Sequence, residues 1–368
     1  MKKSIFKIKN YKSIKEATLE VDKITILIGP PASGKSNILE ALSLIGYVHK
    51  LANEAQQYHS YIQNIPLLST ILRVSSFDEL FFFGLKGEKI EISEVEEDTL
   101  RSIVISDVKT ELMTKHDSNI TYTEFPHIKG LLLFKHLIYW PKTTTVFSYT
   151  TRLYAFDRFN VIANIIDSKK QIDVPVEYLD ELGRNLNNIL YKKKSIIGLI
   201  NEIFKEYEIR IEAKFLREGR LVVFDYDYEV SPNVLSDTFY RFLYYLTAIY
   251  SNYDYAGIHN LENRLVLLFE EPESHVYPYA SRILAEHLAK TIDRLKFIIT
   301  THNPHLISAI WDKVREVITY YVLRDSRGAT IIYRVNMDKL SEKLVDAYDL
   351  LVYKPKKLIE ERILEKTS

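Results

Sequence analysis

The sequence contains no cysteine, which excludes disulfide bonds, thiol catalysis and cysteine-ligated zinc. It also lacks an excess of either charge, because lysine plus arginine and aspartate plus glutamate number 49 each. A positive field over the whole molecule, of the kind that attracts nucleic acid, is therefore not expected. Two short basic runs, Lys192–Lys194 and Lys354–Lys357, suit either a local patch or a solvated turn or helix end.

Long apolar runs are missing too, and no apolar segment follows the basic N-terminus as it would in a signal peptide. We therefore expect a cytoplasmic protein with no membrane partner. Glutamine is scarce, whereas isoleucine, lysine and tyrosine are plentiful. A composition with few thermolabile residues and many charges is typical of a thermophile.

The first part of the chain predicts a strand, a loop and a helix in succession. Residues Ser4–Lys9 and Ala17–Asp22 have the pattern of strands, and the short apolar run Ile24–Ile28 ends at Gly29. The apolar residues that follow the loop share one helical face: Ile38, Ala41, Leu42, Ile45 and Val48. A phosphate-binding unit needs its elements in this order.

The rest of the chain predicts a mixture of strands and helices. We expect strands at Lys89–Ser93, Ser102–Val108, Asn119–Glu124, Leu131–Tyr139, Leu265–Phe269 and Phe297–Ile299, hairpins over 209–226 and 317–335, and helices within 176–204, from Ser236, and over Ala280–Thr291. The helical spacing within 176–204 is interrupted near 192–195. Residues 354–366 read as a charged helix or tail.

The segment Gly29–Ser36 reads GPPASGKS and matches the pattern GxxxxGK[ST] at every fixed position. The pattern predicts that loop N–H groups surround phosphate oxygens, that Lys35 neutralises the β- and γ-phosphates, and that Ser36 ligates Mg²⁺. A chance match in a loop is the alternative, and the flanking strand and helix argue against it. The predicted ATP-binding residues are Gly29, Pro30, Pro31, Ala32, Ser33, Gly34, Lys35, Ser36 and Asn37.

The apolar strand Leu265–Phe269 ends in the sequence Glu270-Glu271-Pro272-Glu273. Placed beside a nucleotide, Glu270 would hold Mg²⁺ directly or through water, and Glu271 would orient and deprotonate the attacking water. The alternative is a strand that ends in a solvated acidic turn. The P-loop in the same chain favours the catalytic interpretation.

The next apolar strand ends in Thr300-Thr301-His302-Asn303-Pro304. We predict that His302 contacts the γ-phosphate and senses its presence. The alternative is a loop histidine with a structural hydrogen bond. A metal site formed by His275, His302 and His305 is disfavoured, because their spacing matches no zinc motif.

In this order, the P-loop, the EEPE strand and the TTHNP loop resemble the ABC-type ATPase heads of the SMC, RecF and overcoming-lysogenization-defect group. The N-terminal stretch FKIKNYKSIKEATLEVDKITILIGPPASGKSNILEAL is similar to the opening of those proteins. EEPESHVYP resembles their EEPExHLHP element, and THNPHLI resembles their switch-histidine loop. The resemblance covers residues 1–50 and 209–335.

The resemblance also implies a signature segment ahead of the EEPE strand. Residues Leu235–Arg241 read LSDTFYR, where the group has LSDGxxR. Ser236 and Asp237, at the start of a helix, would bind the γ-phosphate held by the opposite subunit, and Ser236 can at the same time be a plain N-cap. Thr238 replaces the glycine of this segment, and Pro31 replaces an asparagine common in the P-loop of the group.

The group has two further features near the nucleotide, a basic residue and a glutamine. Lys12 lies where the group often has a basic residue near the nucleotide, although a solvated turn lysine is an equal alternative. The glutamine that contacts Mg²⁺ in many such heads has no clear counterpart, because Gln56, Gln57 and Gln63 lie close to the first helix.

We therefore expect an α/β P-loop NTPase, with an ABC-ATPase-type head that has an antiparallel β part and an inserted mixed or helical subdomain. Residues 1–50 and 209–335 would form the head, and 336–368 a helical tail. Residues 51–208 would hold the antiparallel strands and the inserted subdomain.

The expected function is Mg²⁺-dependent ATP hydrolysis by a homodimer of heads paired head to tail, which drives a partner or DNA in genome maintenance or anti-virus defence. Residues 336–368 are too few for the nuclease domain of the overcoming-lysogenization-defect proteins, so a nuclease or other effector would be a separate protein. The alternative, favoured by Thr238 and Pro31, is a slow nucleotide switch that regulates a partner. A transporter ATPase is disfavoured, because Ser36 and Ser236 are too far apart for the compact helical subdomain of that class.

Overall fold

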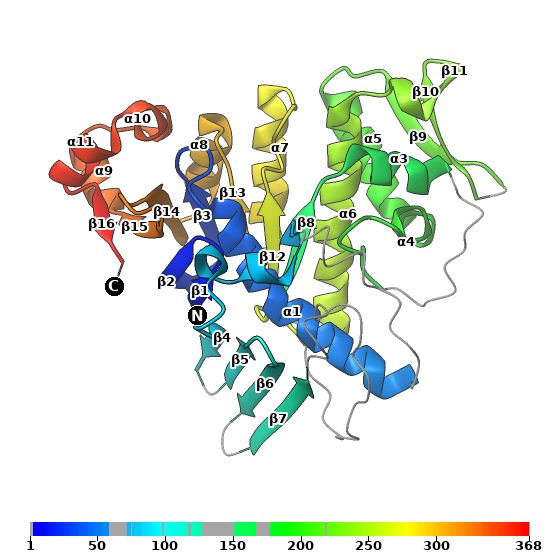
Figure 1. Cartoon of the computed structure of the whole chain (residues 1–368). Coiled ribbons are helices and arrows are strands. Elements are labelled where there is room, and N and C mark those ends of the chain that lie inside the picture. Colours follow the sequence, from blue (N-terminus) through cyan, green and yellow to red (C-terminus); the bar gives the residue numbers. More distant parts are fainter. Residues whose placement is uncertain are drawn as a thin grey trace.

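The computed structural model describes residues 3–58, 72–74, 76–97, 99–116, 119–126, 151–166, 177–217 and 219–367. Its centre is a seven-stranded sheet in the order β16-β15-β14-β3-β13-β12-β8 (Figure 1). The strands are β3 (Ile24–Ile28), β8 (Thr151–Ala155), β12 (Leu265–Glu270), β13 (Leu295–Thr300), β14 (Val317–Arg324), β15 (Thr330–Val335) and β16 (Leu364–Lys366). From β14 to β8 the pairs are parallel, so these strands end at one edge of the sheet.

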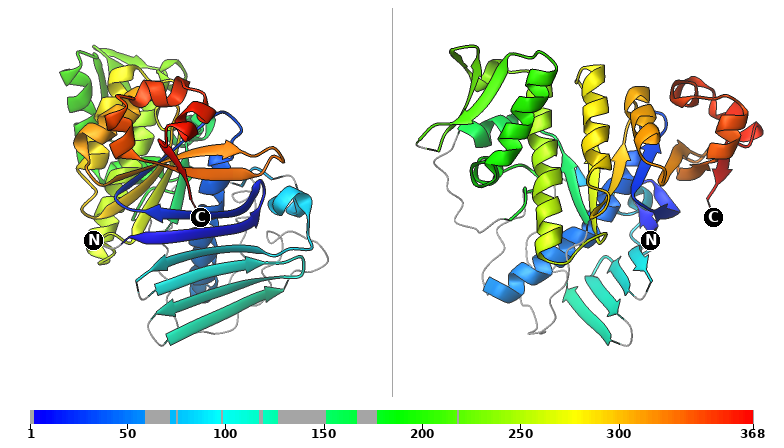
Figure 2. Two further views of the ribbon diagram at one scale, coloured as in Figure 1. Left: turned by 90° about the vertical axis from the view of Figure 1, so that its left-hand side faces the viewer. Right: turned by 180° about the vertical axis from the view of Figure 1, so that it is seen from behind.

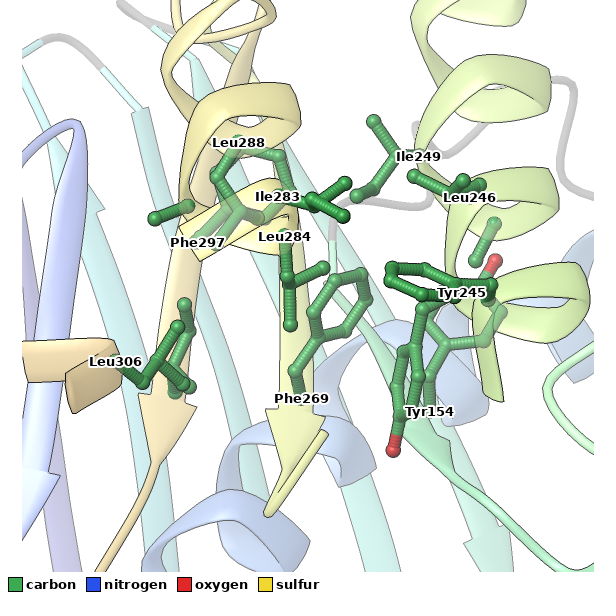
Figure 3. Packing of buried hydrophobic residues seen from close by; sticks show 14 of the residues in the cluster. Tyr154, Tyr245, Leu246, Ile249, Phe269, Ile283, Leu284, Leu288, Phe297 and Leu306 are labelled. Atoms are coloured by element: carbon green, nitrogen blue, oxygen red, sulfur yellow. The ribbon is translucent and has the colours of Figure 1, made fainter. Parts of the chain in front are cut away.

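The central strands are apolar throughout because both faces of the sheet are covered. In β12, Leu267 and Phe269 belong to the cluster packed against α6 (Asp237–Ile258), α7 (Pro278–Ala289) and α8 (Pro304–Lys313). Val266 and Leu268 point to the opposite face and join the cluster that includes residues of α1 (Lys35–Tyr58). Figure 3 shows Phe269 between Tyr245 of α6 and Leu284 of α7.

A second, antiparallel sheet adjoins the first in the order β2-β1-β4-β5-β6-β7 (Figure 2, left). Its strands are β1 (Ser4–Tyr11), β2 (Ile14–Val21), β4 (Ile90–Glu96), β5 (Thr99–Ile105), β6 (Lys109–His116) and β7 (Asn119–Pro126), and the 3₁₀ turns η1 (Phe77–Leu80) and η2 (Phe82–Gly84) precede β4. The two sheets are joined by a buried ion pair, in which Lys296 Nζ of β13 lies 2.8 Å from Glu96 Oε1 of β4.

A helical lobe covers the β8 end of the central sheet, and the C-terminal elements lie at the opposite end (Figure 1). The lobe contains α3 (Arg158–Ile166), α4 (Leu186–Lys192), α5 (Lys194–Glu206), the small sheet of β9 (Ile211–Phe215), β10 (Leu221–Asp225) and β11 (Tyr228–Val230), and the turn η3 (Pro232–Val234). The C-terminal elements are α9 (Met337–Glu342), α10 (Ala347–Val352), α11 (Pro355–Glu360) and β16. None of the described helices is both long and apolar enough to cross a bilayer.

The structure differs from the sequence prediction at several points. β6 has polar residues at most positions and β8 lies in a stretch without a clear pattern, so neither strand was predicted, and α8 was also missed. α1 continues through the boundary predicted at residue 50, and the predicted helical tail ends in a strand, β16. The predicted strand Leu131–Tyr139 lies outside the described residues.

Candidate functional site

Lys35 begins α1 directly after the loop that follows β3, and its side chain folds back over that loop. Nζ donates hydrogen bonds to the carbonyl oxygens of Gly29 and Pro30, each at 2.9 Å, and lies 3.5 Å from Ser33 Oγ. Burial lowers the pKa of Lys35 to about 8. The ammonium group is thus kept at the mouth of the loop. Because burial disfavours an unpaired positive charge, a phosphate anion bound there would stabilise the charged form of Lys35.

Two glycines of the loop are required by its shape. Gly29 and Gly34 have φ values of 138° and 107°, in the region that favours glycine. A Cβ atom at Gly29 would overlap the carbonyl oxygen of Val322 in β14, and one at Gly34 would overlap the hydroxyl of Thr330 in β15. The loop therefore fits against the β14–β15 hairpin with no space for a side chain at either position.

Hydrogen bonds also fix the loop to its surroundings. Arg324 Nε donates to the Ala32 carbonyl at 2.6 Å, and the Thr330 hydroxyl donates to the Ser33 carbonyl at 3.2 Å. Asn37, which was predicted to bind nucleotide, donates to Ser13 Oγ at 2.7 Å, and Ser13 Oγ lies 2.7 Å from the Thr330 hydroxyl. Arg324 and Thr330 both donate to carbonyl oxygens of the loop, so these two contacts do not use the loop N–H groups that would bind an anion.

The two predicted metal ligands are in direct contact. Ser36 Oγ donates to Glu270 Oε1 at 2.6 Å, which joins the start of α1 to the end of β12. Mg²⁺ in nucleotide sites is usually held by one or two protein oxygens together with phosphates and waters, so this pair fits the ion. In the described parts of the chain, no three histidine, aspartate or glutamate side chains form a metal cluster.

Arg73 is a residue of this site that the sequence did not reveal. Its guanidinium donates to Glu270 Oε2, while Nε lies 4.0 Å from Glu40 Oε1 in α1. Lys12 donates to the same Glu40 and to the carbonyl of Leu72. Burial raises the pKa of Glu40, and Lys12 opposes that shift. Glu40 therefore anchors two cations beside the proposed metal position, and Lys12 lies in this network rather than in a solvated turn.

Glu271 and His302 also meet, although they follow different strands. His302 Nε2 lies 3.6 Å from Glu271 Oε1, and Ser274 Oγ donates to Glu271 Oε2 at 3.0 Å. Glu271 has φ of 40°, and its N–H donates to the Thr300 carbonyl at 3.1 Å. Burial, followed by the charge of Lys35, lowers the pKa of His302, so the imidazole is neutral at pH 7 and can both donate and accept.

Glu273, the last residue of the EEPE sequence, has a different environment. Its side chain is 5% exposed and accepts a hydrogen bond from Thr301. Burial raises its pKa to about 7, and Oε2 has no partner among the described residues. Glu273 therefore connects the loops after β12 and β13 and does not face the open part of the site.

The predicted signature segment lies at the exposed start of α6. Ser236 caps the helix and accepts from the Phe239 N–H at 3.4 Å, so its interpretation as an N-cap is correct. Asp237 accepts from Arg158 of α3, which also donates to the Leu235 carbonyl at 3.0 Å. Arg158, which the sequence did not reveal, thereby fixes the segment to the helical lobe.

The same helix reaches the catalytic loop of its own chain. Arg241 Nη1 donates to the Glu271 carbonyl at 3.2 Å, and the Tyr245 hydroxyl donates to the Glu270 carbonyl at 3.1 Å. The predicted P-loop, acidic and histidine residues are thus brought together at the carboxyl edge of the parallel strands, with α6 holding the backbone of both glutamates.

Comparison with known proteins gives a family and a fold. The profile of a family described as "AAA domain, putative AbiEii toxin, Type IV TA system" matches residues 116–308. The chain is similar in structure to an SMC head bound to the C-winged helix domain of ScpA, with 13% identity, a TM-score of 0.50, and coverage of 92% of this chain and 99% of that chain. None of the curated proteins compared with the chain matches it.

Two further SMC heads resemble the chain more loosely. The SMC head domain from Thermotoga maritima is 13% identical with a TM-score of 0.44, covering 91% of this chain and 100% of that chain. The head bound to the C-terminal domain of ScpA from Pyrococcus furiosus is 15% identical with a TM-score of 0.47, covering 94% and 99%. The expected fold class, a P-loop NTPase with an ABC-type head, is confirmed.

Proposed function

The chain belongs to the AAA-domain family whose profile it matches over residues 116–308, and from this premise we propose that it is a Mg²⁺-dependent ATPase. The observation that carries the proposal is the meeting of three sequence motifs at one edge of the sheet. Lys35 covers the P-loop, Ser36 lies 2.6 Å from Glu270, and His302 lies 3.6 Å from Glu271. Lys35 would bind the phosphates, Ser36 and Glu270 the metal, and Glu271 the attacking water.

The proposed roles follow from the surroundings of each side chain. The backbone of Gly29–Ser33 surrounds the phosphates, and Lys35 neutralises them. Ser36 and Glu270 hold Mg²⁺, which when bound would neutralise charge on the phosphate oxygens. The Glu271 carboxylate, 44% exposed, accepts the proton of the attacking water. Neutral His302 donates a hydrogen bond to the γ-phosphate.

We further propose that two copies pair head to tail, with Ser236 and Asp237 of one facing the nucleotide of the other. Ser236 is exposed at the N-terminus of a long helix, a position that favours an anion. Two large apolar side chains are exposed, one close to it in the sequence and one at the start of α7. Val234, two residues before Ser236, is 72% exposed, and Tyr277, at the start of α7, is 67% exposed. Exposed apolar side chains of this size are typical of surfaces that another protein covers.

The proposed biological role is genome maintenance or anti-virus defence, in which ATP turnover drives DNA or a separate effector or nuclease. The family description, which names a toxin of a toxin–antitoxin system, supports a defence role with a second protein as partner. The alternative is a slow nucleotide switch that regulates its partner through binding, and the substitutions Thr238 and Pro31 favour it.

Steady-state phosphate release tests the proposal and separates its two forms. We expect the wild-type chain to release phosphate from ATP with Mg²⁺, to stop when EDTA is added, and to change its rate with double-stranded DNA if DNA is the driven partner. Lys35→Ala is the matched control that removes the phosphate contact. ATP binding with release no faster than in this control would support the switch, and the absence of ATP binding would contradict both forms.

The contact between Arg73 and Glu270 predicts an effect on metal binding. Arg73 occupies one Glu270 oxygen, so its guanidinium competes with Mg²⁺ for the charge of the carboxylate. Arg73→Ala should therefore lower the half-saturating Mg²⁺ concentration by about fivefold, the upper range for a half-exposed ion pair. Mn²⁺ binding in the presence of ADP, followed by electron paramagnetic resonance, measures this directly. Arg73→Lys should stay close to wild type, whereas weaker metal binding by Arg73→Ala would mean that Arg73 assists the ion.

A further inference from the structure

The order of strands in the central sheet sets the direction in which a bound nucleotide extends. β3 carries the P-loop, and β13 and β12, which lead to His302 and Glu271, lie on one side of it. β14 and β15 lie on the other side (Figure 1). This inference rests on the proposed function, in which the γ-phosphate faces Glu271 and His302. The base is at the other end of the nucleotide, so it extends from the P-loop in the opposite direction, toward the β14–β15 hairpin.

The hairpin presents a cation and an exposed turn at this position. Arg324, the last residue of β14, donates through Nε to the Ala32 carbonyl at 2.6 Å and through Nη1 to the Gly328 carbonyl at 2.7 Å. One guanidinium thus connects the P-loop to the hairpin turn. Any group attached to phosphates in the loop and directed to this side passes along Arg324.

Phe83 lies against the same turn, although it comes from a distant part of the chain. The phenyl ring is 53% exposed, and its Cζ atom is 3.4 Å from the position that a Cβ atom at Gly328 would occupy. The Phe83 N–H donates to the carbonyl of Lys12 at 3.0 Å, beside Ser13, which is bonded to Asn37 at the start of α1. A path of contacts therefore leads from the start of α1 to the exposed ring.

The backbone of Phe83 makes its exposure unusual. Its φ of 48° and ψ of 31° place a bulky residue in the left-handed region, where such residues are rare and cost energy. The neighbouring ring of Phe82 lies 4.5 Å away at 50° and supports one side. The chain thus maintains an aromatic face toward solvent next to the P-loop, although burial would be the favourable state for this ring.

We propose that Phe83 is the platform on which the nucleobase stacks, with Arg324 beside it, so that the site holds a nucleotide by its base as well as by its phosphates. Stacking uses the face of the base, which every base has, and makes no contact with its hydrogen-bonding edge. The platform should therefore add affinity for ATP and GTP alike and add none for inorganic tripolyphosphate, which has no base.

Calorimetric titration of the full chain with ATP, GTP and tripolyphosphate, each with Mg²⁺, tests the platform. Phe83→Ala should weaken ATP and GTP binding by about tenfold, the range for loss of one base–aromatic stack, and leave tripolyphosphate binding unchanged. Phe83→Trp should retain wild-type affinity for all three. Tyr348→Ala is the matched control, because Tyr348 is a similarly exposed aromatic residue, at 60%, in α10.

The outcomes separate this proposal from the proposed function. A wild-type chain that binds neither ATP nor tripolyphosphate contradicts nucleotide binding itself. If the wild type binds both and Phe83→Ala binds ATP as tightly, Phe83 is not the platform. A parallel loss of ATP and tripolyphosphate affinity in Phe83→Ala would assign the ring to support of the P-loop and overturn the base-stacking role.

Discussion

Replacing Glu271 with glutamine is expected to lower ATP turnover by at least about 100-fold while ATP still binds, because an amide cannot accept the proton of the attacking water. The substitution keeps the shape of the side chain. It also keeps an oxygen for the hydrogen bond from Ser274, which is 3.0 Å in the wild type, and Lys35 and Ser36 are untouched. Single-turnover phosphate release and equilibrium ATP binding, measured on the same preparation, give the two quantities. Where two copies close around ATP, the variant should also remain dimeric with ATP in gel filtration.

Glu273→Gln is the matched control for this experiment, since it makes the same chemical change two residues away. Glu273 is buried with its pKa raised to about 7, and its partner Thr301 donates the hydrogen bond, so an amide oxygen can replace the carboxyl. Turnover should stay within about threefold of wild type, the effect of less than 1 kcal/mol. Unchanged turnover in Glu271→Gln would remove Glu271 from the mechanism.

The parts of the site that could be predicted are those encoded by consecutive residues. The P-loop has fixed glycines, and Gly29 and Gly34 do have positive φ. The sequences after β12 and β13 are each preceded by a run of apolar residues, which indicated strands buried on both faces. Once two such strands are parallel, their ends meet at one edge, and this places Glu271 beside His302.

The parts that could not be predicted depend on contacts between distant segments. Arg73 lies 197 residues from Glu270, and nothing in the sequence around Arg73 has a pattern of its own. The contact between Arg158 and Asp237 could not be predicted for the same reason, because the two residues are 79 positions apart. β8 joins the central sheet by pairing with β12. It has five residues and no flanking turn signals, so the segment is too short for its alternation to be recognised in the sequence.

Mixing two inactive variants should restore ATP turnover if each site is shared between two subunits. Ser236→Arg places a large cation at the exposed start of α6 and should lower turnover by about 100-fold through the partner's site, while its own P-loop still binds ATP. Lys35→Ala should abolish ATP binding in its own P-loop and leave its signature segment intact. Each variant alone, as a symmetric dimer, then has no complete site.

The mixed dimer has one complete site, which combines the P-loop of the Ser236→Arg chain with the signature segment of the Lys35→Ala chain. Random pairing makes half of the dimers mixed, with one of two sites active, so turnover should recover to roughly a quarter of the wild-type rate. Glu271→Gln mixed with Lys35→Ala is the control, because Glu271 lies close to Lys35 of its own chain, so no mixed dimer has a complete site and turnover should not recover. Ser236→Arg with wild-type turnover on its own would leave Ser236 as a helix cap alone. Inactivity of both variants without recovery on mixing would mean that each head contains a complete site.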